Sequence, residues 1–181
     1  MYYGKTIILR ALEVTDTEAC HQWMNDPEVT HWLGMRYPLS MQQEQKWIEA
    51  EHNPQKEIHF AATTLDGRLI GSCGLINIDP VSRNAELGIS IGEKTCWNQG
   101  FGKDMMITLC AYGFQMLNLH KIHLRVAAPN LRAIKCYEKC GFQHEGCLRE
   151  GFYKHGAYHD LILMGLLLHE HKEIFPERWE N

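Results

Sequence analysis

The sequence of 181 residues lacks a long hydrophobic run, since its longest apolar stretch, Leu161 to Leu168, is far too short to span a bilayer. The first residues also lack the apolar core of a secretory signal peptide. The seven cysteines show no spacing typical of a disulfide framework. These absences predict a protein of the reducing cytoplasm with no membrane partner.

An excess of basic residues is also missing, because the formal net charge is -4 and the pI is about 6.2. This balance gives no footprint for nucleic acid, and no nucleic-acid partner is expected. No repeat, low-complexity segment or linker divides the chain. We therefore expect a single domain over residues 1–181, with a core from about 5 to 168 and a polar, peripheral tail.

Motifs for several other chemistries are absent. The eleven histidines are scattered without Cys or carboxylate spacing typical of a metal site, so no metal is expected. Cys136 and Cys140 are interpreted as ordinary thiols, and neither Cys96 nor Cys147 belongs to a recognisable Cys-His nucleophile pair. The one glycine-rich loop lacks the third glycine of a dinucleotide site and the Gly-Lys-Ser/Thr ending of a P-loop.

The order of periodic segments predicts an α+β domain with a largely antiparallel sheet. Strand patterns and helix patterns alternate along the chain, and turn residues separate them. The strand at 121–127 follows a crossover helix, so it should pair in parallel with the strand at 85–91. Strands are expected at 7–12, 59–65, 68–78, 85–91, 121–127, 142–153 and 158–168, and helices at 16–25, 40–52, 103–117 and 130–140.

The segment from Trp97 to Asp104 contains the pattern Gly-Phe-Gly between a strand and a helix. Glycine allows a tight turn and a close approach of backbone to a ligand. The unpaired N–H groups at the start of the helix offer an anion site. The same pattern also suits a plain strand-to-helix connection, so the loop alone leaves the function open.

Four motifs occur in order along the second half of the chain. They are Ala85-Glu-Leu-Gly-Ile-Ser-Ile-Gly-Glu-Lys94, Cys96-Trp-Asn-Gln-Gly-Phe-Gly102, Asn130-Leu-Arg-Ala-Ile-Lys-Cys-Tyr-Glu-Lys-Cys-Gly-Phe142 and Gly156-Ala-Tyr-His-Asp-Leu-Ile-Leu-Met-Gly-Leu-Leu167. Together they resemble the GNAT (Gcn5-related N-acetyltransferase) superfamily, in the branch of ribosomal-protein N-terminal acetyltransferases and spermidine acetyltransferases. The resemblance extends over about residues 5–168 and implies helices on both faces of the sheet and a splayed parallel pair of central strands.

The resemblance implies that acetyl-CoA is the acetyl donor. Branch members often carry Gly-Lys where this chain has Asn98-Gln99, and Lys103 is the candidate to replace the missing charge. Backbone of the strand at 89–91 would pair with the pantetheine arm, and one of its amides would polarise the thioester carbonyl. The expected acetyl-CoA contacts are Ile89, Ser90, Ile91, Trp97, Asn98, Gln99, Gly100, Phe101, Gly102, Lys103 and Asn130.

Direct acetyl transfer requires an amine that has lost its proton, a stabilised oxyanion and a protonated leaving thiolate. Tyr137 resembles the family tyrosine that acts as general acid, although an aromatic core residue would show the same helical spacing. Glu86 resembles the strand glutamate that removes the amine proton; it could equally bind a substrate ammonium or face solvent.

The acceptor is not identified by these motifs. Trp32, Arg36 and Tyr37 lie in the loop where the family forms part of the acceptor site, although loop packing explains them equally well. His155 and His159 are interpreted first as solvated hairpin residues. A protein N-terminus, a polyamine and an amino sugar remain alternative acceptors, and the family also implies a homodimer. The alternative to an enzyme is a non-catalytic module that senses acetyl-CoA or binds a partner.

Overall fold

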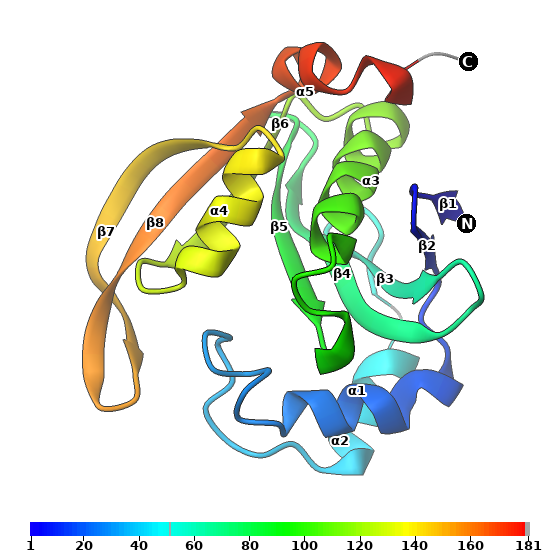
Figure 1. Cartoon of the computed structure of the whole chain (residues 1–181), viewed down its shortest axis with the longest axis vertical. Helices are drawn as coiled ribbons and strands as arrows, with labels where there is room; N and C mark the ends of the chain where they lie inside the picture. Colours follow the sequence, from blue (N-terminus) through cyan, green and yellow to red (C-terminus); the bar gives the residue numbers. More distant parts are fainter. Residues whose placement is uncertain (51, 180–181) are drawn as a thin grey trace.

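The computed structural model describes residues 1–50 and 52–179. Within them the chain forms an eight-stranded sheet in the order β1-β2-β3-β4-β5-β6-β8-β7 (Figure 1). Strands β5 and β6 pair in parallel, and every other neighbouring pair is antiparallel. The strands are β1 (Tyr2–Tyr3), β2 (Ile7–Arg10), β3 (Ile58–Thr64), β4 (Leu69–Asp79), β5 (Asn84–Ile91), β6 (Lys121–Ala127), β7 (Gln143–Lys154) and β8 (Ala157–Leu167).

Helices lie on both faces of this sheet, as the resemblance implied. Helix α3 packs its buried side chains on one face, while α2 places Trp47 against His59 on the opposite face. None of the described helices is long and apolar enough to cross a membrane. The helices are α1 (Thr17–Met24), α2 (Met41–Glu49), α3 (Phe101–Met116), α4 (Leu131–Lys139) and α5 (Leu168–Ile174), with short 3-10 turns at Val14–Asp16, Lys94–Cys96 and Pro176–Arg178.

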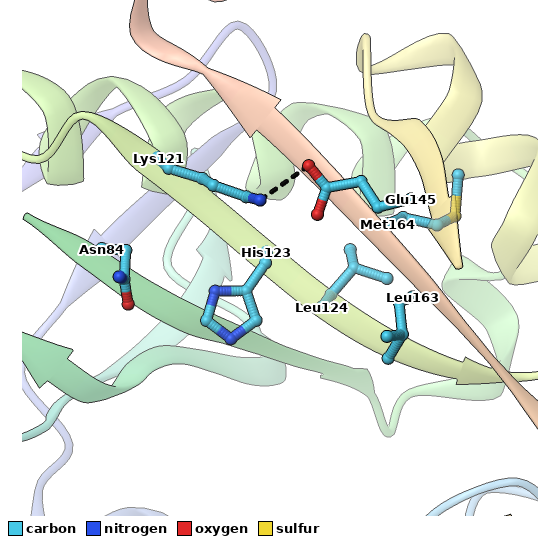
Figure 2. A pocket seen from close by; sticks show the side chains of 7 residues that line it. All are labelled: Asn84, Lys121, His123, Leu124, Glu145, Leu163 and Met164. Atoms are coloured by element: carbon cyan, nitrogen blue, oxygen red, sulfur yellow. Dashed lines mark ion pairs between the residues drawn. The ribbon is translucent and has the colours of Figure 1, made fainter. Parts of the chain in front are cut away.

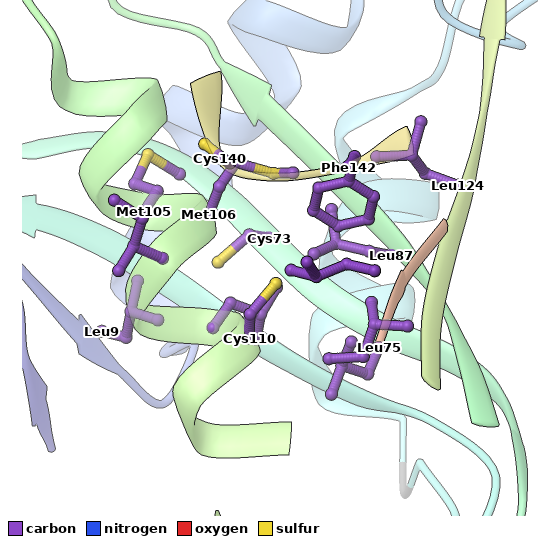
Figure 3. Packing of buried hydrophobic residues seen from close by; sticks show 14 of the residues in the cluster. Leu9, Cys73, Leu75, Leu87, Met105, Met106, Cys110, Leu124, Cys140 and Phe142 are labelled. Atoms are coloured by element: carbon purple, nitrogen blue, oxygen red, sulfur yellow. The ribbon is translucent and has the colours of Figure 1, made fainter. Parts of the chain in front are cut away.

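The hydrophobic core lies between the sheet and α3 (Figure 3). Helical spacing predicts one buried face formed by Met106, Leu109, Cys110, Phe114 and Leu117. The first four are buried, Leu117 is only half-buried, and Met105 on the neighbouring face is buried as well. Helix α3 is therefore enclosed on most sides and not amphipathic. Gly113 permits this close packing, because a Cβ there would lie 2.9 Å from a methyl group of Leu75.

The predicted peripheral tail is the main correction to the fold. The chain continues beyond β8 as α5, which fully buries His171 and carries the chain to Phe175, only 7% exposed. His171 contacts the rings of Phe114, Phe175 and Trp179. Apolar and aromatic residues at 168, 171, 175 and 179 follow helical spacing, but the charged residues between them concealed this pattern.

Candidate active site

The parallel pair β5–β6 separates along its length, as predicted. Its residue pairing is confined to Asn84–Glu86 against Lys121–His123. From Leu87 to Ile91, β5 is paired with β4 on one side only. Gly88 lies on this stretch, and a Cβ built on it would meet nothing within 4 Å. The separation therefore leaves strand backbone free to pair with an extended ligand.

The glycine loop follows β5 and turns directly into α3. Gly100 caps the helix with φ 89°, a left-handed conformation that favours glycine, and Asn98 also has a positive φ of 61°. The first helical hydrogen bond runs from the N–H of Asp104 to the carbonyl of Gly100, so the N–H groups of residues 101–103 have no partner within the helix. This arrangement suits a phosphate group.

Gly102 has a different role in the same loop. A Cβ at Gly102 would lie 3.3 Å from a methyl carbon of Ile91 and 4.0 Å from the sulfur of Cys136. The absent side chain therefore lets α3 approach both β5 and α4. Gly100 supplies the turn and Gly102 the close packing, and together they hold the loop at the end of the β5–β6 separation.

A cation that sequence reasoning missed stands beside this loop. The guanidinium of Arg132 lies 4.4 Å from the ring centroid of Trp97, whose indole N–H donates to the carbonyl of Ile91 at 2.8 Å. Lys103 is exposed on the first turn of α3. Arg132 directly follows the Asn-Leu pair that opens the third motif, so its position in that motif was the available signal.

Asn130 and Tyr137 both belong to α4. Asn130 caps the helix, with its side-chain oxygen accepting a hydrogen bond from the N–H of Ala133 at 3.3 Å. Tyr137 packs against Phe142 on the helix face toward the core. Burial, with smaller contributions from the thiols of Cys136 and Cys140, raises the pKa of Tyr137 well above its ordinary value. Its phenol consequently stays protonated, as a general acid requires.

Glu86 is not a free carboxylate. Arg125 donates to it from Nε at 2.8 Å and from Nη2 at 3.2 Å, and the side-chain amide of Asn77 donates at 3.2 Å. Its side chain is 13% exposed. This pairing was not predicted, because Glu86 and Arg125 are far apart along the chain. Any catalytic or binding role of Glu86 therefore has to be compatible with its ion pair to Arg125.

His123 is a second titratable group at the same position, and sequence reasoning did not select it. It lies opposite Glu86 in the parallel register, where the pairing of β5 and β6 ends. It lines a cavity of about 290 Å³ with the ion pair Lys121–Glu145 (Figure 2). Burial lowers the pKa of His123, although Glu86 opposes this effect. The alternation Lys121-Ile-His-Leu-Arg125 was the available signal.

The predicted acceptor loop spans the end of the sheet where β5 and β6 diverge. At one side Lys94, just after β5, forms ion pairs with Asp26 and Glu28 at 2.8 and 2.5 Å. At the other side the ammonium of Lys154, at the end of β7, donates to the carbonyls of Leu33 and Met35. The loop is therefore fixed at both ends.

Aromatic rings line the contact between this loop and the β7–β8 hairpin. Trp32 lies edge-on to His159 at 5.3 Å between ring centroids, and His31 stacks on His155 at 4.3 Å. The structure thus brings Trp32 together with two histidines that were interpreted as solvated. Arg36 lies near enough to Lys154 to contribute to the lowering of its pKa, of which burial is the main cause, and Tyr37 is exposed.

The comparisons with known proteins agree with this geometry. Residues 6–143 match the family model for the acetyltransferase (GNAT) domain. The spermidine N(1)-acetyltransferase of Vibrio cholerae is 34% identical over 162 residues, which cover 89% of this chain and 92% of that protein. The spermidine N(1)-acetyltransferase of Escherichia coli is 32% identical, with 92% and 88% covered.

A solved structure shows the same likeness in three dimensions. Spermidine N-acetyltransferase from Vibrio cholerae in complex with CoA and spermine superposes with a TM-score of 0.86 at 31% identity, covering 92% of this chain and 98% of that one. The residues matched by the family model extend from β2 through the glycine loop and α4. The chain therefore belongs to the GNAT family of acetyltransferases.

Proposed function

We propose that this chain transfers acetyl from acetyl-CoA to a primary amine of a polyamine. The observation that carries the proposal is the β5–β6 separation with a left-handed glycine loop at its end. The polyamine class is supported by the similarity to spermidine acetyltransferases, one of them in complex with spermine. Seven free cysteines fit a reducing compartment, and we propose the cytoplasm.

The residues around the loop fit a pyrophosphate and an extended arm. In the proposal the N–H groups from Asn98 to Lys103 hold the phosphates, with Arg132 and Lys103 as the nearby cations. The free edge of β5 at Ile89, Ser90 and Ile91 pairs with the amides of the pantetheine arm. The side-chain oxygen of Asn130 caps α4, so its amide group is the part that remains to donate to the arm.

The reaction forms a bond between the amine nitrogen and the acetyl carbon and breaks the bond from that carbon to sulfur. A backbone amide of Ile89, Ser90 or Ile91 stabilises the oxyanion. The Tyr137 hydroxyl donates its proton to the departing thiolate, and the raised pKa of Tyr137 keeps that proton available. No covalent intermediate on the protein is needed.

A base has to remove the proton of the substrate amine. Glu86 and His123 lie opposite each other in the β5–β6 register, and the lowered pKa of His123 leaves its ring neutral near pH 7. We assign proton removal to His123, directly or through water in the cavity that it lines. Glu86, held by Arg125, supplies negative charge that attracts the ammonium form of the acceptor.

The proposed acceptor surface presents an aromatic ring to the substrate. Trp32 offers a ring face or edge near the hairpin, and an ammonium over an aromatic ring gains about 0.5–2 kcal/mol. The net charge of -4 favours the approach of a polycation. Arg36 and Tyr37 complete the proposed acceptor surface from the same loop.

Initial rates of thiol release from acetyl-CoA, measured with spermidine, an N-terminal peptide and an amino sugar, test the proposal. The expected result is a kcat/KM for spermidine at least roughly tenfold above the other two acceptors. In Trp32→Ala the KM for spermidine should rise about threefold to tenfold while the KM for acetyl-CoA stays unchanged. A preference for the peptide would replace the polyamine by a protein N-terminus, and saturable acetyl-CoA binding without turnover would favour a sensor.

A further inference from the structure

Two histidines and a glutamate converge beside α2, away from the residues assigned to acetyl transfer. Nδ1 of His52 lies 2.9 Å from Oε1 of Glu57, and Nε2 of His59 lies 3.3 Å from Oε2 of the same carboxylate. One ligand atom from each residue can be chosen so that all three lie within 4.8 Å of one another. Zinc bound tetrahedrally at roughly 2.0–2.1 Å needs its ligand atoms about 3.3 Å apart, so small side-chain rotations suffice.

The hydrogen bonds of His52 orient its ring for a cation. Nε2 of His52 lies 2.9 Å from the carbonyl oxygen of Trp47 and has to donate its proton to it. A neutral His52 ring therefore carries a lone pair on Nδ1, which points at the carboxylate of Glu57. A positive centre between these two atoms relieves that repulsion. Metal-bound histidines commonly donate the other ring N–H to a carbonyl in this way.

The surroundings hold His59 in a matching position. Its side chain is only 16% exposed, and its ring packs on Trp47 and His52 at 5.1 and 4.8 Å between centroids. Gly74 on β4 leaves room for it, because a Cβ there would lie 2.9 Å from Nδ1 of His59. The packing around this ring therefore holds Nε2 of His59 toward the carboxylate of Glu57.

We infer that His52, Glu57 and His59 form a site for one divalent transition-metal ion, with Zn²⁺ as the chemically preferred occupant. Two imidazoles and a carboxylate are a common zinc ligand set, with a water molecule as the fourth ligand. The sequence predicted no metal, because its motifs were judged by local spacing, and this cluster depends on the turn between α2 and β3 that brings His52 back to His59.

The position of the site indicates what the ion would do. His59 is opposite Gly74 in the β3–β4 register, and Gly74 is opposite Gly88 in the β4–β5 register. Two strand spacings, about 10 Å, thus separate His59 from the separated part of β5. An ion there would join the end of α2 to β3 and hold α2 against the acceptor side of the sheet. Its role is to brace that side, since no reacting atom is within reach.

Metal binding by the full chain, measured without substrates, tests this inference independently of the acetyl-transfer activity. After treatment with a chelator, the protein should bind one Zn²⁺ per chain in a competition titration with a chromophoric chelator. The double variant His52→Gln/His59→Gln should lose roughly 100-fold in affinity. His169→Gln, which changes an exposed histidine outside the cluster, is the matched control and should bind like the wild type.

Two further measurements identify the metal ligands without relying on the double variant. Co²⁺ bound to the wild type should show the visible spectrum of nitrogen and oxygen ligands without a thiolate charge-transfer band, which excludes the seven cysteines. Anomalous diffraction at the zinc edge should place the ion between the three side chains, even if the double variant fails to fold. A thiolate band, an unchanged affinity in a folded double variant, or an anomalous peak elsewhere would overturn the inference.

Discussion

Tyr137 is both a packed side chain of α4 and the proposed general acid. Because burial raises its pKa, the phenol remains a proton donor throughout the neutral range. Tyr137→Phe removes the hydroxyl and keeps the ring contact with Phe142. We expect kcat to fall at least roughly tenfold with little change in the KM for acetyl-CoA, as measured by thiol release at saturating acceptor. Tyr158→Phe, on an exposed residue of β8, is the control, and equal rates in both variants would exclude the acid role.

The burial of His171 is expected to lower stability in acid. Burial lowers its pKa from 6.5 to about 4, although a hydrogen bond with the carbonyl of Ile107 opposes this. The folded state therefore gains stability above pH 6.5, and this gain is lost as the pH falls from 6.5 to about 4. One group with this shift contributes about 2.5 kcal/mol between pH 7.5 and pH 4.5.

Urea unfolding at these two pH values measures the effect. In the wild type the free energy of unfolding should fall by about 2.5 kcal/mol more than in His171→Phe, because the phenylalanine cannot be protonated. Each protein is compared with itself, so any general loss of packing in the variant cancels. Identical pH dependence in the two proteins would mean that His171 is accessible to protons in the folded state.

At the scale of the element, strand β5 has room for a larger side chain at Gly88. A side chain there would meet no atom within 4 Å, and this glycine has no positive φ. It lies on the same face as Glu86, two residues away, where the acceptor is proposed to enter. Gly88→Val should therefore leave the free energy of unfolding unchanged or up to about 1 kcal/mol higher.

The same variant should impair catalysis. The valine side chain fills the separation of β5 and β6 from the acceptor side, so the KM for spermidine should rise by roughly tenfold or more while the KM for acetyl-CoA changes less. Ser72→Val on β4, opposite Ser90 in the register, places the same side chain one strand away as a control. A normal KM for spermidine in a folded Gly88→Val protein would place the acceptor elsewhere.

Elements with a clear local pattern were predicted to within a few residues. The strand expected at 59–65 is observed as Ile58–Thr64, and the helix expected at 130–140 as Leu131–Lys139. Their turn residues and alternating side chains act locally, so the sequence contains the signal. Strand β1 was not predicted, because two residues of edge strand depend on pairing with β2 and carry no period of their own.

At the scale of the whole molecule, several predictions that failed or were missing depend on long-range contacts. The tail was expected to be peripheral, yet α5 buries His171 against Phe114 of α3. The ion pair of Glu86 with Arg125 and the docking of Trp32 on the β7–β8 hairpin likewise join distant segments. Local periodicity cannot report such partners, whereas the glycine loop was recognisable because its proposed function requires consecutive residues.

Asp104 joins both ends of the chain to the glycine loop. Its carboxylate accepts hydrogen bonds from the backbone N–H groups of Lys5 and Thr6 at 3.0 and 2.6 Å, and from Arg178 at 3.1 Å. Only 8% of the residue is exposed. Gly4 makes room for it, because a Cβ there would lie 2.5 Å from a carboxylate oxygen. Asp104 also belongs to the first turn of α3, so these contacts hold the helix end that is proposed to bind the phosphates.

Asp104→Asn keeps the shape of the side chain but removes its charge. One carboxylate oxygen that accepts hydrogen bonds is replaced by an NH2 group, which faces other hydrogen-bond donors. Hydrogen bonds to charged groups are worth about 1.5–3 kcal/mol, so the free energy of unfolding should fall by about 2 kcal/mol in urea. The KM for acetyl-CoA should rise as well, because the loop loses its support. Glu177→Gln breaks only the exposed ion pair with Lys5 and should cost less than about 0.5 kcal/mol. If the two variants lose equal stability, the chain ends do not support the loop through Asp104, and the loop must be held by α3 and β5 alone.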